Sequence, residues 1–221
     1  MWLWNRANVQ IHNVVEELIK HITTIKAANS AHEIFEKLEK LGSVFRLDAH
    51  SLPTKWRCAT VAPEEFEQLK LVQAQVRLGR VSEIRDGEVV LSQGRLPIEK
   101  DTLFVDCSAN GLAQHAAVPI FAGKRITLQS VFMWQQVFSV AIIGKLDNID
   151  INDEKRNRMW KVVPHPERVE DYPVSMVQTF ENLANGNKYT PWWLMRCRLN
   201  IMSHMSLLDY LTGSIRSLIA S

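Results

Sequence analysis

The first part of the chain carries apolar residues at helical spacing. Over residues 9–25 they recur at intervals of four and five positions, with further apolar residues beside them, as on one face of a helix. Ser30 and Glu33 then match a capping box, in which the serine accepts a bond from the backbone of Glu33 and the glutamate returns one to the backbone of Ser30. The pattern predicts two helices joined as a hairpin, the second ending at Gly42, and a third short helix that begins near Pro63.

An extended pattern replaces the helical one after Gln73. Apolar residues in 76–84 are spaced as in a strand. The dipeptide Asp86–Gly87 favours a tight turn, and residues 88–92 are expected to form the returning strand. A further turn leads to residues 96–98, whose proline is tolerated at the edge of a sheet. Together these features predict a small antiparallel meander.

Three consecutive apolar residues, Leu103–Val105, follow the predicted meander. A strand without alternation is covered on both faces, which is typical of an inner strand of a parallel sheet. A run of small residues from Cys107 to Gly111 comes directly after it. Because ligands in open α/β sheets bind at the carboxyl ends of such strands, we expect a ligand crevice at this point.

The remainder of the chain is mainly helical in pattern. Residues 131–144 are expected to form a buried helix or strand, because the stretch is short for a bilayer span and two glutamines interrupt it. Residues 175–184 and 191–203 are further predicted helices. An apolar stripe at helical spacing then continues along Met205, Leu208, Leu211, Ile215 and Leu218. This stripe is either a dimer face or a surface that packs on the chain's own core, so a homo-oligomer is one of two open alternatives.

Composition narrows the classes of partner. The formal net charge is +2 and no basic run has the density of a nucleic-acid-binding patch, so no nucleic-acid partner is expected. The three cysteines are far apart, which argues against a disulfide framework and favours a reducing, cytoplasmic location. The histidines include no HExxH motif, so no metal site is predicted. No signal peptide and no bilayer-spanning segment is recognised, and no membrane partner is expected.

The stretch from Gln73 to Leu112 resembles a segment of FAD/NAD(P)-binding oxidoreductases, the broad group that includes the flavin monooxygenases. In that group a β-meander is followed by an acidic residue, an apolar strand and a small-residue turn of the Ala-Thr-Gly type. Asp101 matches the acidic residue, Leu103–Val105 the apolar strand, and Cys107–Ala109 the turn. The resemblance implies FAD and NAD(P) as cofactors. The cofactor-binding residues that it implies are Asp106, Cys107, Ser108, Ala109, Asn110 and Gly111.

The resemblance also implies an architecture of the α/β class, mixed α+β in appearance. A helical segment over residues 1–60 precedes the β-meander and the end of a parallel dinucleotide-binding sheet, which occupy residues 61–130. A helical C-terminal cap follows over residues 131–221. The expected function is that of the C-terminal portion of an FAD/NAD(P)-dependent oxidoreductase, a flavoprotein in which this portion supplies part of the cofactor crevice and a substrate cap.

One feature of these enzymes is absent from the chain. They hold FAD with a Gly-x-Gly-x-x-Gly turn after their first strand, whereas the nine glycines here are all isolated. If the resemblance holds, the chain is truncated and the main FAD-binding half is a missing N-terminal partner, so tight FAD binding by this chain alone is not expected. The absent turn also motivates an alternative from another class, a non-catalytic α+β protein-interaction module. No catalytic residue is predicted.

Two groups of residues have alternative interpretations. Cys107 is either a redox thiol or a small buried residue that fills the alanine position, and the second is favoured because no other cysteine is near it in sequence. Trp134, Trp160, Trp192 and Trp193 either line an apolar substrate pocket or belong to the core. The core is favoured, since tryptophans at helical positions are usually buried.

Overall fold

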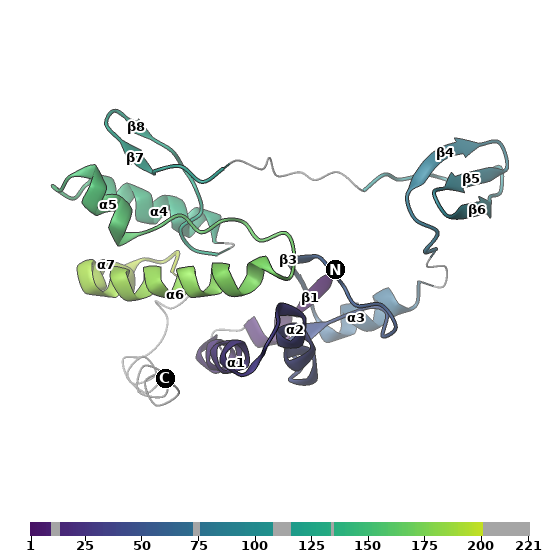
Figure 1. The fold of residues 1–221 in the computed structure, drawn as a ribbon, viewed down its shortest axis with the longest axis horizontal. Helices are drawn as coiled ribbons and strands as arrows, with labels where there is room; N and C mark the ends of the chain where they lie inside the picture. The colour runs from purple at the N-terminus through teal and green to yellow at the C-terminus, as the bar shows by residue number, and fades with distance from the viewer. Residues whose placement is uncertain (10–13, 73–75, 108–115, 134, 201–221) are drawn as a thin grey trace. The chain divides into compact units, whose positions relative to one another are not determined.

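The computed structural model has a mixed α/β architecture and divides into two compact units (Figure 1). Unit 1 combines Met1–Leu69 with the described part of Ala117–Ser221, and unit 2 is the described part of Lys70–Ala116. Their boundaries fall elsewhere than those of the three consecutive parts expected from the sequence. The structure describes residues 1–9, 14–72, 76–107, 116–133 and 135–200.

Unit 1 begins with a small sheet. Strand β1 (Trp2–Asn5) lies between β2 (Val44–Phe45) and β3 (Trp56–Val61), antiparallel to β2 and parallel to β3. The first three residues of β1 are buried, so the strand is covered on both faces. Residues 1–60, expected to be helical, thus also contain three strands. The parallel pair β1–β3 is distinct from the dinucleotide-binding sheet that the resemblance implies, and no parallel sheet of that kind occurs among the residues described.

The helices of this part of unit 1 lie close to where the spacing of apolar residues predicts them. A short 3-10 helix, η1 (Arg6–Val9), follows β1. Helices α1 (Val14–Ala27) and α2 (Ala31–Lys40) are joined by a short connection. Helix α3 (Pro63–Lys70) begins at its proline, which suits the first helical position. The apolar spacing over residues 9–25, the capping box that begins at Ser30 and the proline at 63 therefore predicted α1, α2 and α3 correctly.

The start of α2 confirms one half of the predicted capping box and corrects the other. Ser30 Oγ accepts a bond of 3.2 Å from the backbone N–H of Glu33, as predicted. The Glu33 carboxylate accepts its bond of 2.8 Å from the backbone N–H of Asn29, one residue earlier than the expected Ser30. Glu33 also pairs with Lys37 at 2.8 Å, and this bond, with the Asn29 bond, lowers the pKa of Glu33 to about 2.

Aromatic rings form the core between this sheet and the helices. Trp2 stacks on Phe35 with ring centroids 5.4 Å apart, and Phe35 lies 5.1 Å from Tyr172. Tyr172 also meets Trp56 edge-on at 4.9 Å. Because Tyr172 belongs to α6 (Asp171–Tyr189), far along the chain, the N-terminal and C-terminal parts of unit 1 share one core. Rings of this size bury large apolar areas and dominate the energetics of such a core.

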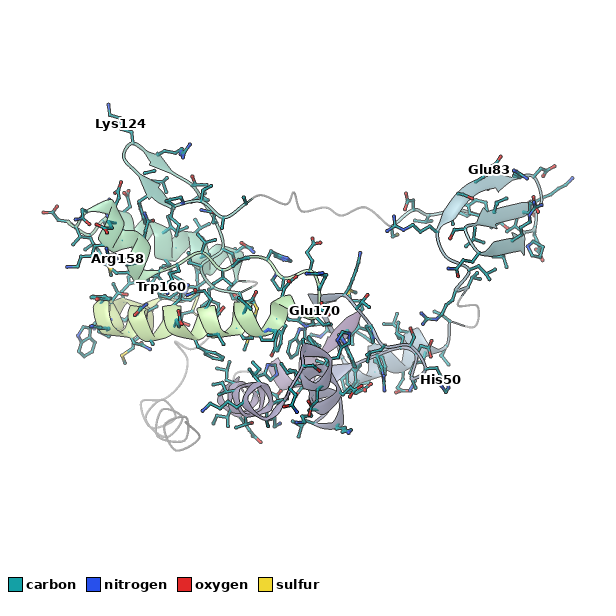
Figure 2. All side chains as sticks on the ribbon, in the orientation of Figure 1. His50, Glu83, Lys124, Arg158, Trp160 and Glu170 are labelled. Atoms are coloured by element: carbon teal, nitrogen blue, oxygen red, sulfur yellow. The ribbon has the colours of Figure 1, made fainter. Side chains whose placement is uncertain are left out.

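The C-terminal part of unit 1 forms a second core. Its elements are the hairpin β7 (Phe121–Ala122) and β8 (Arg125–Ile126), and the helices α4 (Gln136–Asp147), α5 (Asp153–Met159), α6 and α7 (Pro191–Arg196). Lys124 stands at the tip of the hairpin (Figure 2). Residues 131–144 were expected to form a buried helix or strand; helix α4 instead spans Gln136–Asp147, and only one of its faces is buried. The core is made by Phe121, Phe132, Phe138, Ile142, Ile143, Leu146, Met159, Trp160 and Leu194, with their neighbours.

Helix α6 buries polar side chains in both cores. Ser175, Thr179, Asn182 and Gly186 are spaced at four, three and four positions, on one face, and all are buried. Asn182 donates bonds of 2.7 Å to the carbonyl oxygens of Val131 and Lys161, and accepts one of 3.0 Å from the Lys161 N–H. Thr179 Oγ1 accepts from the N–H of Met133, and Ser175 Oγ donates to the Pro164 carbonyl. The helix thereby pairs backbone groups of two irregular segments, around residues 131–133 and 161–164.

Unit 2 contains the predicted meander. Its strands are β4 (Val81–Arg85), β5 (Glu88–Leu91) and β6 (Gly94–Pro97), paired antiparallel in that order. The turn between β4 and β5 falls on Asp86–Gly87, with Gly87 at φ 78°, which explains the glycine. The first strand begins at Val81 rather than at residue 76. The backbone before it instead approaches Ser92, whose hydroxyl accepts a bond from the N–H of Arg80.

Two helical glycines give opposite predictions for the same substitution. A Cβ added at Gly186 would collide with the buried ring of Trp160, whereas one added at Gly144 in α4 meets nothing within 4 Å. Gly186→Ala is therefore expected to lower the free energy of unfolding by about 1–3 kcal/mol through overpacking. Gly144→Ala is expected to raise it by about 0.5–1 kcal/mol, because alanine loses less backbone entropy. Urea unfolding of both variants measures this, and two changes of the same sign would contradict the packing described for Trp160.

Candidate functional site

The residues implied as cofactor-binding lie in and after an irregular segment of unit 2. Asp106 and Cys107 are both exposed, and residues 102–107 belong to neither a helix nor a strand. Ser108, Ala109, Asn110 and Gly111 lie outside the described residues. Asp101 is exposed in the turn that precedes the segment, where the Thr102 N–H donates to the Glu99 carbonyl at 3.2 Å. The structure therefore brings Asp106 and Cys107 to an accessible surface next to the meander.

The prediction of a covered inner strand at Leu103–Val105 is wrong for this structure. Leu103 is 85% exposed, Phe104 44% and Val105 72%. The segment belongs to no strand, and no described strand pairs with it. A run of apolar residues is typical of a strand buried on both faces, but the run alone does not show that the segment is buried.

The alternatives for Cys107 and the tryptophans are resolved in part. The favoured view of Cys107 as a small buried residue is wrong, because its side chain is exposed. Trp160 belongs to the core, as favoured, and Trp193 packs partly against it. Trp192 is 72% exposed, so the core prediction fails there, and Trp134 lies outside the described residues. These tryptophans do not converge on a pocket within the part of the chain that is described.

A polar depression lies between α5 and α6 in unit 1. It has a volume of about 340 Å³ and is lined by Asn152, Glu154, Lys155, Arg158, Met159, Asn185 and Tyr189. Asn152 caps α5 by accepting from the Lys155 N–H at 2.9 Å. Arg158 pairs with Glu154 one turn earlier, and both side chains are at least 70% exposed (Figure 2). An exposed ion pair beside water holds a ligand weakly, so the depression is not a convincing site.

Helix α5 was not predicted from the sequence. The signal was present, because Asn152 precedes two acidic residues and two arginines follow them. An asparagine N-cap, acidic residues in the first turn and basic ones in the last turn are what helix ends favour.

Two ionisable groups with perturbed pKa values, His21 and Tyr172, form a buried pair. The Tyr172 hydroxyl and His21 Nδ1 are 2.6 Å apart, and the His21 ring stacks on Trp4 with centroids 4.7 Å apart. His21 Nε2 lies 3.8 Å from Glu17. Burial, followed by the charge of Lys20, lowers the pKa of His21 to about 4. Burial, followed by Glu17, raises the pKa of Tyr172 well above its usual value.

Perturbed groups often mark active sites, but this pair has a structural role. Both rings are enclosed by the aromatic core, and His21 is only 6% exposed, so a substrate does not reach them. Within the described ranges, no three His, Cys, Asp or Glu side chains come together as metal ligands. The same residues include no helix that is both long and apolar enough to cross a membrane.

Comparison with known proteins shows long relatives and no assigned family. Uncharacterized proteins of Mycobacterium bovis and of two strains of Mycobacterium tuberculosis are each 33% identical to the chain over 212 residues. Each match covers 92% of this chain and 39% of the relative. The chain thus spans about two fifths of the length of these relatives. No family model matches the chain, and no solved structure matches it.

The buried histidine predicts a pH dependence of stability. The pKa of His21 is about 4 in the folded chain, against about 6.5 when unfolded. The folded state therefore favours the neutral ring, and its contribution is fully present above about pH 6.5 and is lost as the pH falls towards 4. The size is on the order of 3 kcal/mol. Urea unfolding of the wild type between pH 4 and 7 should show this loss.

Two variants separate His21 from other titrating groups. His21→Gln removes the ionisable ring, so its stability should fall less steeply over the same pH range. His50→Gln, at an exposed position, should keep the slope of the wild type. Equal slopes for His21→Gln and the wild type would mean that His21 does not titrate as its burial requires.

Proposed function

We propose that this chain is the C-terminal portion of an FAD/NAD(P)-dependent oxidoreductase, supplying part of the cofactor crevice and a substrate cap. Flavin and nicotinamide would supply the redox chemistry of such an enzyme. Support comes from the order of the elements in unit 2. The meander β4–β6 is followed by Asp101, by the apolar segment Leu103–Val105, and by Asp106 and Cys107, in the order that the resemblance requires.

The observation that carries the proposal is the exposure of Asp106 and Cys107 directly after an apolar segment. In dinucleotide-binding sheets, ligands meet the polypeptide just beyond the carboxyl ends of strands, and a carboxylate there can accept hydrogen bonds from ribose hydroxyls. An accessible carboxylate and small side chain at this position are suited to line such a crevice. Asp106 is thus the residue of this chain to which we assign cofactor contact.

The described residues do not by themselves fit a dinucleotide. Residues 102–107 belong to no sheet, and the nine isolated glycines offer no phosphate-binding turn. The proposal therefore concerns a portion that becomes a cofactor site only together with further polypeptide. The relatives support this, because about three fifths of each one lies outside the match. That remainder is where we propose the main FAD-binding fold.

A second candidate function, a non-catalytic protein-interaction module, is favoured by the outer faces of two helices. On α4, Val137 and Val140 are 67% and 46% exposed. On α6, Val174 and Val177 are 67% and 50% exposed. Exposed apolar pairs one turn apart are suited to contact another protein. Such contacts are compatible with a substrate cap as well as with an interaction module, so flavin binding is the property that separates the two functions.

The first test is flavin binding with and without the remainder of the protein. The 221-residue chain alone should show no thermal shift with micromolar FAD. Co-expressed with the part of the Mycobacterium tuberculosis relative outside the match, it should yield a complex with flavin absorbance. A complex without flavin would contradict the oxidoreductase proposal and favour the interaction module.

Matched carboxylate variants locate the contact. Asp106→Ala should weaken flavin or nicotinamide retention by about tenfold, the loss expected for one hydrogen bond to a charged group. Asp86→Ala, an exposed carboxylate in the turn of the meander, should leave retention unchanged. Equal effects of the two substitutions would remove the assignment of Asp106.

A further inference from the structure

The outer face of helix α4 is apolar. The helix buries Phe138 and Ile142 in the second core of unit 1, whereas Val137 and Val140 on the opposite side are 67% and 46% exposed. No charged residue occurs in the helix before Lys145. A surface helix normally carries polar residues on the side that faces away from the core. The described residues of unit 1 thus leave an apolar helix face that a further element is suited to cover.

The outer face of α6 is less suited to such a cover. Its exposed valines, Val174 and Val177, lie in the same row as Glu181. The Glu181 carboxylate pairs with the Lys161 ammonium at 3.1 Å. An apolar element laid along this row would take the ion pair out of water, which costs free energy that the pair does not return. An apolar partner is therefore expected on α4 rather than on α6.

The chain beyond Asn200 carries a matching apolar stripe. Residues 201–221 lie outside the described residues, and their sequence places five apolar side chains at helical spacing, Met205, Leu208, Leu211, Ile215 and Leu218. Asp209 and Arg216 fall on another side of such a helix. A helix of this length is marginal in water, and Gly213 weakens it further. The stripe therefore needs a partner surface in order to become helical.

The last described residues lie close to α4. Asn200 is buried, and its side chain donates a bond of 3.0 Å to a backbone carbonyl of α7. In α7, the ring of Trp193 stacks on Phe138 of α4 with centroids 6.3 Å apart. Met205 is five residues beyond Asn200, and an extended chain of that length spans at most about 17 Å. The stripe therefore begins within reach of the exposed face of α4.

We propose that residues 205–218 form a helix whose apolar stripe packs on Val137 and Val140 of α4 in the same molecule. The contact joins two apolar faces and buries no charge. The short connection after Asn200 favours the molecule's own α4 over that of a second copy, because it gives an effective concentration on the order of millimolar. Of the two alternatives for the stripe, the proposal selects packing on the chain's own core. It concerns unit 1 alone and does not depend on flavin binding.

Matched valine variants test the contact in the full chain. Val140→Asp changes the proposed surface, and Val177→Asp changes a valine of α6 that is similarly exposed, at 50% against 46%. Val140→Asp should lower the melting temperature by about 4 °C or more, because it places a charge in the apolar contact. Val177→Asp should change it little. Equal shifts for the two variants would overturn the inference.

A substitution in the stripe shows whether the two surfaces touch. Leu211→Asp should lower the melting temperature of the wild type and of Val177→Asp to the same extent. In Val140→Asp it should have almost no further effect, because the contact is already lost and the two changes are not additive. Full additivity of Leu211→Asp and Val140→Asp would contradict a shared contact.

Amide hydrogen exchange distinguishes the molecule's own helix from that of a second copy. The amides of residues 205–218 should be protected in the wild type and in Val177→Asp, and should exchange rapidly in Val140→Asp. The protection should not depend on protein concentration. Absence of protection in the wild type would overturn the inference. Protection that appears only at high protein concentration, together with a dimer in light scattering, would also overturn it and assign the stripe to a second copy.

The reciprocal measurement covers the case in which Val140→Asp does not fold. In Leu211→Asp, the methyl NMR signals of Val137 and Val140 should shift from their wild-type positions, because the side chains that cover them are lost. The signals of Val174 and Val177 should stay unchanged. Shifts confined to the valines of α6 would place the stripe there and overturn the assignment to α4.

Discussion

The fold of unit 1 depends on how helix α6 bonds to the backbone of two segments that have no regular structure. Val131 belongs to the second core and Met133 to the first, and Trp160 and Val163 are divided in the same way. Both segments therefore pass from one core to the other, and backbone groups that are buried there are costly to leave unpaired. The carboxamide of Asn182 bonds to both of them, and neighbouring hydroxyls on the same helix face add further bonds.

This arrangement explains which parts of the structure were predictable from the sequence. Apolar spacing predicted helix α1, the cap at Ser30 predicted α2 and Pro63 predicted α3. The turn dipeptide Asp86–Gly87 predicted the meander. These signals depend on residues close together in the sequence, so they can be recognised without knowledge of the tertiary structure. Helix α6 was also predicted, but its buried face includes Ser175, Thr179 and Asn182 beside apolar residues, so burial there does not follow hydrophobicity alone. The reason lies in the tertiary structure, where these polar side chains bond to the backbone of residues 131–133 and 161–164.

The remaining disagreements have a different physical origin. Strand β1 is buried on both faces. It is so short that the periodicity of its apolar residues does not distinguish a strand from a helix. For Leu103–Val105, the run of apolar residues predicted burial, whereas the structure exposes all three side chains. The candidate site was predictable as a chemical pattern around Asp106 and Cys107, whereas its geometry depends on contacts that local sequence does not encode.

The order of the two units along the chain has a consequence for folding. Unit 1 is assembled from residues on either side of unit 2, and its His21–Tyr172 bond joins positions 151 residues apart. Closing so long a loop is slow, since the chain entropy is lost before the aromatic core compensates for it. The free-energy cost itself rises only by about 0.6 kcal/mol for each doubling of the loop. Unit 2 therefore delays the folding of unit 1 more than it destabilises it, which makes residues 70–116 a tolerant place for evolutionary change in length.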